Sequence, residues 1–291
     1  MLKQIHKDLI EQVEKNGIAK CHVSDILHQK DRDKFNNIID FYNDFLSSPH
    51  IADRCNKIFN GNPIQDKHKW YEITQYEYLN RGLNLKDGDF IKFFLSETFI
   101  EMARLYFNND VKLRNTLTWV HPQNAFQREF SSQEWHRDPE DLKILKIFVN
   151  FNDIDQDQGP TQYVKETQYG GKHQNITFNL NGGDKIKIGP GWPLQYPIPS
   201  ENVTDVSGPV GTVCFVNTHG LHKGGLVKEG VRCLGQGLYL SKNAYAFSPS
   251  AHEDHNLKSF NNNPNLNFID FESKEFKSLN DKQKFALNEM F

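Results

Sequence analysis

The sequence predicts a mainly β protein with flanking helices, and three observations lead to this fold class. From Leu113 onward the apolar runs are short, and the turns between them are rich in Gly, Asn and Pro. Many short strands of this kind are typical of a jelly-roll or cupin-like core, the double-stranded β-helix. Before residue 110, apolar residues recur at helical spacing instead. We therefore expect a double-stranded β-helix core with a helical N-terminal part.

The N-terminal part begins with a predicted helix over residues 3–15. Its apolar residues fall on one face, and Gly17 follows as the residue type that most readily ends a helix in the left-handed conformation. Residues 18–23 then alternate as expected for an edge strand.

Two further helices are expected before the β core. Ser24 is a good cap for a helix that reaches Phe45 or Leu46. A third helix is predicted from Asp89 to Phe107. Its many aromatic residues favour packing against a sheet over a cofactor pocket.

Three apolar runs form the predicted centre of the core, at residues 142–151, 211–218 and 231–240. Between the first and second lies a long connection, residues 170–209, which is rich in Gly and Pro. Loops of this length are usually functional or disordered, and a substrate lid is one hypothesis. After the core, a last helix is expected near Ser278, capped by the Ser278/Asp281 pair.

Length and composition favour one domain. With 291 residues, of which 37% are apolar, the chain can bury a full core. We expect a single domain over 1–291, with a mainly helical part at 1–110, the β-helix core at 111–245 and a C-terminal extension at 246–291.

Charge and cysteine content exclude several classes of partner. The formal net charge is −3 and there is no basic stripe, so neither nucleic acid nor an anionic membrane is an expected partner. No apolar run is long enough to span a bilayer, and the first residues are too polar for a signal peptide. The four cysteines lack metal-type spacing. These features predict a cytoplasmic protein, and they do not indicate its oligomeric state.

The candidate chemistry is carried by His136, Asp138, His222 and Arg232. A histidine and an aspartate two residues apart on a strand point the same way, and a distant histidine can complete one face of a metal site. Such a facial triad is typical of non-heme iron(II) oxygenases and leaves three coordination positions open. Arg232 lies where a fixed cation could hold the far carboxylate of a keto acid.

The residues around this pattern resemble those of one family, the phytanoyl-CoA dioxygenase-like branch of the iron(II)/2-oxoglutarate-dependent oxygenases. The resemblance covers roughly residues 115 to 241. It is carried by three segments: Gln133-Glu134-Trp135-His136-Arg137-Asp138, Phe151-Asn152-Asp153-Ile154-Asp155 with Gly159-Pro160-Thr161, and Leu221-His222-Lys223-Gly224-Gly225 with Arg232. Residues 165–168 depart from it, because many relatives carry a Gly-Ser-His turn there.

The resemblance implies that His136, Asp138 and His222 bind iron(II) and that Arg232 pairs with 2-oxoglutarate. It also favours His222 over His219 as the second histidine, because the family's arginine follows its distal histidine by about ten residues. His219 is then expected to be a hydrogen-bonding neighbour of the site.

The activity implied is hydroxylation of an unactivated C–H bond in a small organic molecule, with 2-oxoglutarate and O2 consumed and succinate and CO2 released. Desaturation, epoxidation or ring formation by the same chemistry stays open. A different class also stays open, a metal- or small-molecule-binding module that turns nothing over. Gln133 is a candidate for cosubstrate contact, and Trp135 and Trp192 are candidates for substrate contact. The sequence does not identify the substrate.

Overall fold

The computed structural model describes residues 2–47, 49, 89–122, 131–133, 135–175, 200–253 and 277–287. Within them the helices are α1 (Gln4–Asn16), α2 (Val23–Ile26), α3 (Gln29–Leu46), α7 (Asp89–Phe94), α8 (Glu97–Phe107), α9 (Pro249–Glu253) and α12 (Asp281–Leu287), with short 3-10 turns at Ser131–Gln133, Ser200–Asn202 and Tyr245–Phe247. The strands are β1 (Ile18–His22), β2 (Val111–Pro122), β3 (Leu145–Asn150), β4 (Gln162–Val164), β5 (Val203–Asp205), β6 (Thr212–Val216), β7 (His222–Lys223) and β8 (Val231–Ser241).

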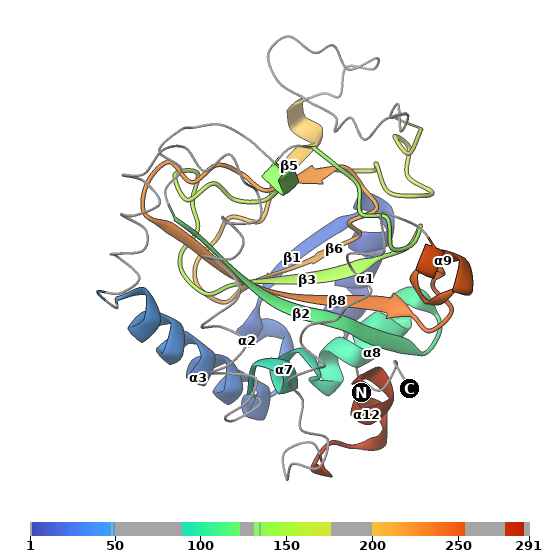
Figure 1. Ribbon diagram of the computed structural model, residues 1–291, viewed down its shortest axis with the longest axis horizontal. Helices are drawn as coiled ribbons and strands as arrows, with labels where there is room; N and C mark the ends of the chain where they lie inside the picture. The colour runs from blue at the N-terminus through green and yellow to red at the C-terminus, as the bar shows by residue number, and fades with distance from the viewer. Residues whose placement is uncertain are drawn as a thin grey trace.

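The strands form two antiparallel sheets. The larger sheet has five strands in the order β1-β6-β3-β8-β2, and the smaller has three in the order β5-β4-β7. In Figure 1 the helices α2, α3, α7 and α8 lie below the larger sheet, while β5 of the smaller sheet lies above it. The mainly β prediction with a helical N-terminal part is therefore confirmed.

Side chains of β3 alternate between the two faces of the larger sheet. Leu145, Ile147 and Val149 are buried with the residues of the helices in the main core cluster. Phe148 faces the opposite way and packs with residues of the smaller sheet, among them Tyr163 of β4. Because successive side chains of a strand point to opposite faces, Lys146 shares the inner face between the two sheets.

Two glycines of β8 make room for the aromatic layer under the larger sheet. A Cβ atom added at Gly237 would lie 2.5 Å from the ring of Phe94, and one added at Gly235 would lie 2.3 Å from the ring of Phe151. The helix-facing aromatic rings can approach the backbone of β8 closely only because these positions lack a side chain.

Substitution of Gly237 by alanine is expected to lower the free energy of unfolding by about 1–3 kcal/mol, the usual cost of overpacking a core. Urea titration would measure it. The double variant Gly237→Ala with Phe94→Leu should recover part of the loss, since the smaller side chain vacates the space of the ring. Equal stability of the parent and Gly237→Ala would contradict this packing.

The N-terminal predictions are confirmed at α1 and β1. Gly17 has φ +81° and its N–H donates to the carbonyl of Val13, so it ends α1 in the left-handed conformation. β1 lies at the edge of the larger sheet, as predicted for residues 18–23.

The second and third predicted helices are each broken into two, and these predictions were wrong in detail. His22 caps α2 instead of Ser24, because its ring accepts the backbone N–H of Ser24, while Asp25 accepts the backbone N–H of His22. Leu27 is extended after α2, and α3 begins anew at Gln29.

The break in the third predicted helix lies at Ser96. Its backbone is extended and its hydroxyl accepts the backbone N–H of Phe99, which starts α8. Serine side chains offer the backbone this alternative to a continuous helix. The run from Asp89 to Phe107 is therefore the two helices α7 and α8.

The C-terminal helix α12 packs against α8 and β2. The predicted cap, the Ser278/Asp281 pair, was wrong. Asn280 and Gln283 cap the helix instead, through reciprocal hydrogen bonds of 3.0 and 3.1 Å. The side chain of Gln283 also donates to the carbonyl of Leu95. None of the described helices is long and apolar enough to cross a membrane.

Much of the proposed 170–209 connection lies outside the described residues, which include only 170–175 and 200–209 of it. Its described end contains the short turn Ser200–Asn202 and β5, which pairs with β4. The lid hypothesis for this connection stays a prediction.

Candidate metal centre

Three side chains from two distant segments of the chain lie together: His136 and Asp138 from one segment and His222 from the other. One ligand atom from each lies within 4.8 Å of the other two. Nε2 of His136 lies 3.9 Å from Oδ1 of Asp138, and Nε2 of His222 lies 3.6 Å from Oδ2 of the same carboxylate. The two imidazole rings have centroids 4.2 Å apart. The structure thus brings together the three residues that the sequence pattern selected.

Backbone pairing sets the positions of the two histidines. His136 and His222 form an antiparallel bridge, with N–H to carbonyl distances of 2.9 and 3.0 Å in the two directions. The backbone N–H of Asp138 donates to the carbonyl of Thr218, so the carboxylate is held against the same turn. These backbone hydrogen bonds therefore fix the spacing of all three side chains.

Arg137, between the two ligands, secures the surrounding loops. Because side chains alternate along an extended segment, it points away from its neighbours. Its guanidinium donates to the carbonyls of Thr167 and His219 at 2.5 Å each. Arg137 thus ties the turn before His222 to the loop after β4.

The orientation of the His222 ring suits a metal ligand. Its Nδ1 lies 2.9 Å from the carbonyl of Gly220. When Nδ1 carries the proton and donates it to that carbonyl, the lone pair of Nε2 faces the cluster. Metal-binding histidines in proteins are usually oriented by such a hydrogen bond.

The electrostatics keep both kinds of ligand in the form that binds a cation. Burial first, and then the neighbouring His136, lower the pKa of His222 to about 3, so its ring is neutral near pH 7. Burial alone would raise the pKa of Asp138, but the charge of Lys146, whose ammonium also donates to the carboxylate, holds it well below its usual range. Neutral imidazoles and an ionised carboxylate are the states that coordinate a metal.

Lys146 is a member of the site that the sequence analysis missed. Its Nζ lies 2.6 Å from Oδ2 of Asp138, and the side chains of both residues are 12% exposed. Strand alternation would have placed Lys146 on the same face as Phe148, but only after the inner face of β3 was known.

Arg232 is buried on β8, with 1% of its surface exposed. One terminal nitrogen donates to the carbonyls of Gly159 and Gly225, while Nε has no hydrogen-bond partner. Burial lowers the pKa of Arg232 to about 10, so it keeps its charge at pH 7. Among the described residues no carboxylate forms an ion pair with it, so the cation has capacity for an anion from outside the chain.

Gly224, two residues after His222, lies close to the guanidinium of Arg232. A Cβ atom added at Gly224 would lie 3.3 Å from a terminal nitrogen of Arg232 and 3.9 Å from Cγ of Gln133. Gln133 is itself 4% exposed, and its Oε1 has no hydrogen-bond partner. Gln133 and Arg232 thus approach the same point, two residues beyond His222.

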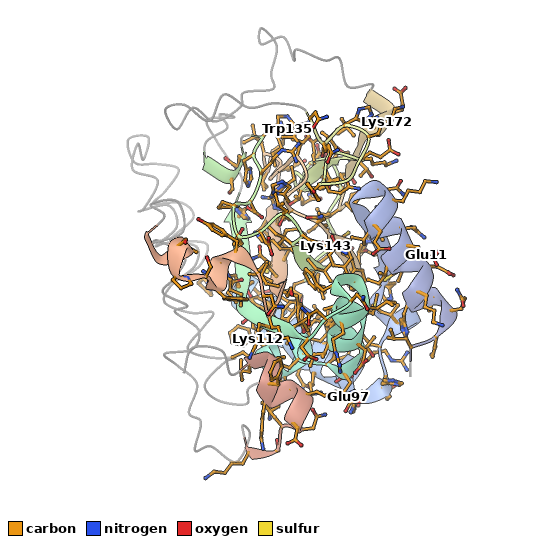
Figure 2. All side chains as sticks on the ribbon, turned by 90° about the vertical axis from the view of Figure 1, so that its right-hand side faces the viewer. Glu11, Glu97, Lys112, Trp135, Lys143 and Lys172 are labelled. Atoms are coloured by element: carbon orange, nitrogen blue, oxygen red, sulfur yellow. The ribbon has the colours of Figure 1, made fainter. Side chains whose placement is uncertain are left out.

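The other residues singled out in the sequence are Trp135, His219 and Trp192. Trp135 is 5% exposed, and the ammonium of Lys223 lies 5.3 Å from the centroid of its ring. Figure 2 shows Trp135 near the end of the molecule opposite Lys112 and Glu97. His219 does not belong to the three-residue cluster, and Trp192 lies outside the described residues.

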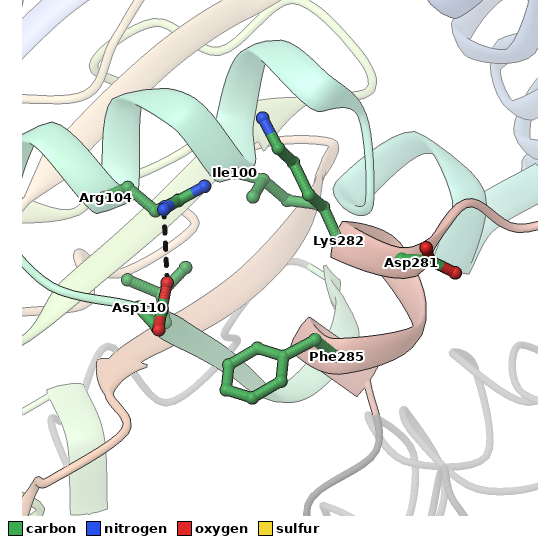
Figure 3. Close-up of a pocket in the computed structure, with 7 residues that line it drawn as sticks. Ile100, Arg104, Asp110, Asp281, Lys282 and Phe285 are labelled. Atoms are coloured by element: carbon green, nitrogen blue, oxygen red, sulfur yellow. Dashed lines mark ion pairs between the residues drawn. The ribbon is translucent and has the colours of Figure 1, made fainter.

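A hollow of about 310 Å³ lies between α8, β2 and α12, and none of its lining residues belongs to the cluster. Figure 3 shows the ion pair of Arg104 and Asp110 on one side and Phe285 on the other. It is open to the surface and contains no group of metal ligands, so we assign it no chemistry.

The donor set fits a divalent transition metal. Two imidazole nitrogens and one carboxylate oxygen on one face, with a single negative charge, form the two-histidine, one-carboxylate arrangement of non-heme iron(II) sites. A structural zinc site would instead be closed by four ligands.

Comparison with known proteins supports the fold. No family model and no curated protein matches the sequence. Among solved structures, the chain is similar to the non-heme alpha-ketoglutarate-dependent epimerase SnoN from nogalamycin biosynthesis, with a TM-score of 0.50 and 12% identity over 83% of this chain and 85% of that one. AviO1 from Streptomyces viridochromogenes gives 0.47 and 12% over 84% and 97%, respectively. EctD from S. alaskensis with 2-oxoglutarate and 5-hydroxyectoine gives 0.48 and 14% over 80% and 74%. The likeness to SnoN shows a shared fold, and the predicted double-stranded β-helix core is thereby confirmed.

Proposed function

We propose that this protein is an iron(II)- and 2-oxoglutarate-dependent dioxygenase that hydroxylates an unactivated C–H bond of a small organic molecule. One observation carries the proposal: His136, Asp138 and His222 form an open facial cluster beside a buried arginine that has no anionic partner among the described residues. A site that only stored a metal would need neither the open face nor the spare cation.

Each residue has a distinct part in this proposal. His136, Asp138 and His222 hold iron(II), while Arg232 holds the far carboxylate of 2-oxoglutarate through charge-assisted hydrogen bonds. Gln133 approaches the same point as Arg232, and its side-chain amide N–H donates a hydrogen bond to the cosubstrate. Trp135 lines the substrate side, because its buried indole offers an apolar surface near the metal-binding segment.

The iron and the keto acid, when bound, would activate O2, which is the oxidant of the reaction. One molecule each of 2-oxoglutarate, O2 and substrate gives succinate, CO2 and the hydroxylated product, so one oxygen atom enters succinate and the other enters the product. The protein's own part is to position the reactants and exclude water. No separate acid or base is required.

The fold shared with SnoN supports this reaction class, and the sequence motifs favour the phytanoyl-CoA dioxygenase-like branch within it. We also propose a cytoplasmic location with a small molecule as the partner. Cys21, Cys214 and Cys233 are free thiols, which suits a reducing compartment where iron(II) persists.

The test is a titration followed by product analysis. Iron(II) and then 2-oxoglutarate, added without oxygen, are expected to bind at one equivalent per chain and to give a weak visible charge-transfer band. Oxygen and a panel of small metabolites should then give substrate-stimulated succinate release, and a product heavier by one oxygen atom.

Three results would redirect the proposal. Failure of the iron-loaded protein to bind 2-oxoglutarate would contradict it. Binding of both without succinate release for any metabolite would favour the non-catalytic module. A product two hydrogens lighter than its substrate would indicate desaturation or ring formation in place of hydroxylation.

A further inference from the structure

Lys146 occupies an unusual position for a lysine. It lies on the inner face of β3, where the neighbouring Phe148 packs against the smaller sheet, and only 12% of its side chain is exposed. Lysines are almost never buried unless paired. Its partner is Asp138, the carboxylate of the proposed metal centre, at 2.6 Å.

The two carboxylate oxygens of Asp138 differ in their contacts. Oδ2 lies 2.6 Å from the ammonium of Lys146 and 3.6 Å from Nε2 of His222. Oδ1 lies toward Nε2 of His136, at 3.9 Å. Oδ2 is therefore balanced by a fixed cation inside the protein, whereas Oδ1 has no such partner among the described residues and faces His136.

We propose that Lys146 is a positioning residue that keeps Asp138 a one-oxygen ligand. This inference rests on the proposed function. By holding Oδ2, the ammonium prevents the carboxylate from chelating the metal with both oxygens. A carboxylate that binds through one oxygen leaves one more coordination position open than a chelating carboxylate does. The facial arrangement needs three open positions, two for a bidentate keto acid and one for oxygen.

Removing the ammonium has two effects on a bound metal, and both act in one direction. Oδ2 becomes available as a fourth ligand atom, and the repulsion between the lysine and a divalent cation disappears. Both raise the affinity for the metal, and the first also closes a coordination position on it. The metal-free protein would lose stability, because the buried carboxylate of Asp138 would lack its partner.

The experiment compares Lys146→Met with Lys146→Arg and the parent, with Mn²⁺ as the probe. Methionine retains most of the length of the side chain without its charge, and arginine keeps the cation. For Lys146→Met we expect about tenfold tighter Mn²⁺ binding by calorimetry. We also expect one exchangeable water fewer on the bound ion by water proton relaxation. Lys146→Arg should resemble the parent in both measurements.

Lys143→Met is the matched control. Lys143 lies three residues earlier, is 43% exposed, and pairs with Glu14 outside the barrel. This variant loses the same charge from the chain, so its Mn²⁺ affinity and water count should equal those of the parent.

The outcomes distinguish this inference from the proposed function. If the parent binds no Mn²⁺ at the cluster, the proposed function fails. If the parent binds Mn²⁺ but Lys146→Met shows unchanged or weaker affinity and the same number of waters, Lys146 does not control the carboxylate and only this inference fails. Tighter binding and a lost water in Lys146→Arg would overturn it equally, because the cation would then not be what matters.

Discussion

Replacing His222 by alanine is expected to abolish stoichiometric binding of iron(II), with an affinity loss of more than about 100-fold. The estimate is a lower bound, because changes to residues that only support a ligand already cost 10–100-fold. His222 is 5% exposed and its Nε2 faces the carboxylate of Asp138. The charge-transfer band with 2-oxoglutarate should disappear along with the metal.

His219→Ala is the control for this result. It removes another partly buried histidine from the same turn, but one outside the three-residue cluster. Burial, followed by the charge of Arg137, lowers the pKa of His219, so its loss changes little of the charge near the metal at pH 7. Calorimetry should show that this variant keeps most of its iron affinity. If His219→Ala loses the metal while His222→Ala retains it, the assignment of the second histidine is wrong.

Arg232→Lys is expected to weaken 2-oxoglutarate binding at least tenfold while iron affinity stays nearly unchanged. Lysine keeps the charge but loses the planar, two-point grip on a carboxylate. One lost charge-assisted contact costs on the order of 1.5–3 kcal/mol, which corresponds to about ten- to more than a hundredfold in affinity. Anaerobic titration of the iron-loaded protein with 2-oxoglutarate would measure it.

Arg232→Ala should bind the cosubstrate still more weakly, because the far carboxylate of 2-oxoglutarate would be desolvated without a partner. High concentrations of 2-oxoglutarate should partly restore turnover in the arginine variants and not in His222→Ala. Since Arg232 also donates to the carbonyls of Gly159 and Gly225, urea titration of each variant is needed as a stability control. Parent-like binding of 2-oxoglutarate by Arg232→Ala would show that the anchor lies elsewhere.

The sequence predicted the members of the cluster because their signals are local. A histidine and an aspartate two residues apart share a face of any extended segment. The choice of His222 over His219 came from the family resemblance, which implies a spacing of about ten residues to the arginine. The sheets themselves followed from the short apolar runs. Their order, with β3 between β6 and β8, depends on pairings between distant segments and had no local signal.

The errors have different causes. Ser96 looks like any polar residue within an apolar helical run, yet it starts α8 because its hydroxyl accepts a backbone N–H. Likewise, Asn280 and Ser278 are equally good caps by composition, and packing of Gln283 on the carbonyl of Leu95 favours the later start. Lys146 was missed because its meaning depends on which face of β3 is enclosed. Tertiary contacts decide the last two of these cases, and a local hydrogen bond decides the first.

The backbone bridge between His136 and His222 has a consequence for how the protein acquires its metal. Because these two residues exchange hydrogen bonds with each other, their separation is preorganised by the polypeptide and does not wait for an ion. Little conformational entropy is then lost at the moment of capture. Unlike small domains that fold around zinc, this chain should keep its far-ultraviolet circular dichroism spectrum after treatment with a chelator, and should reload with a fast, single-step association.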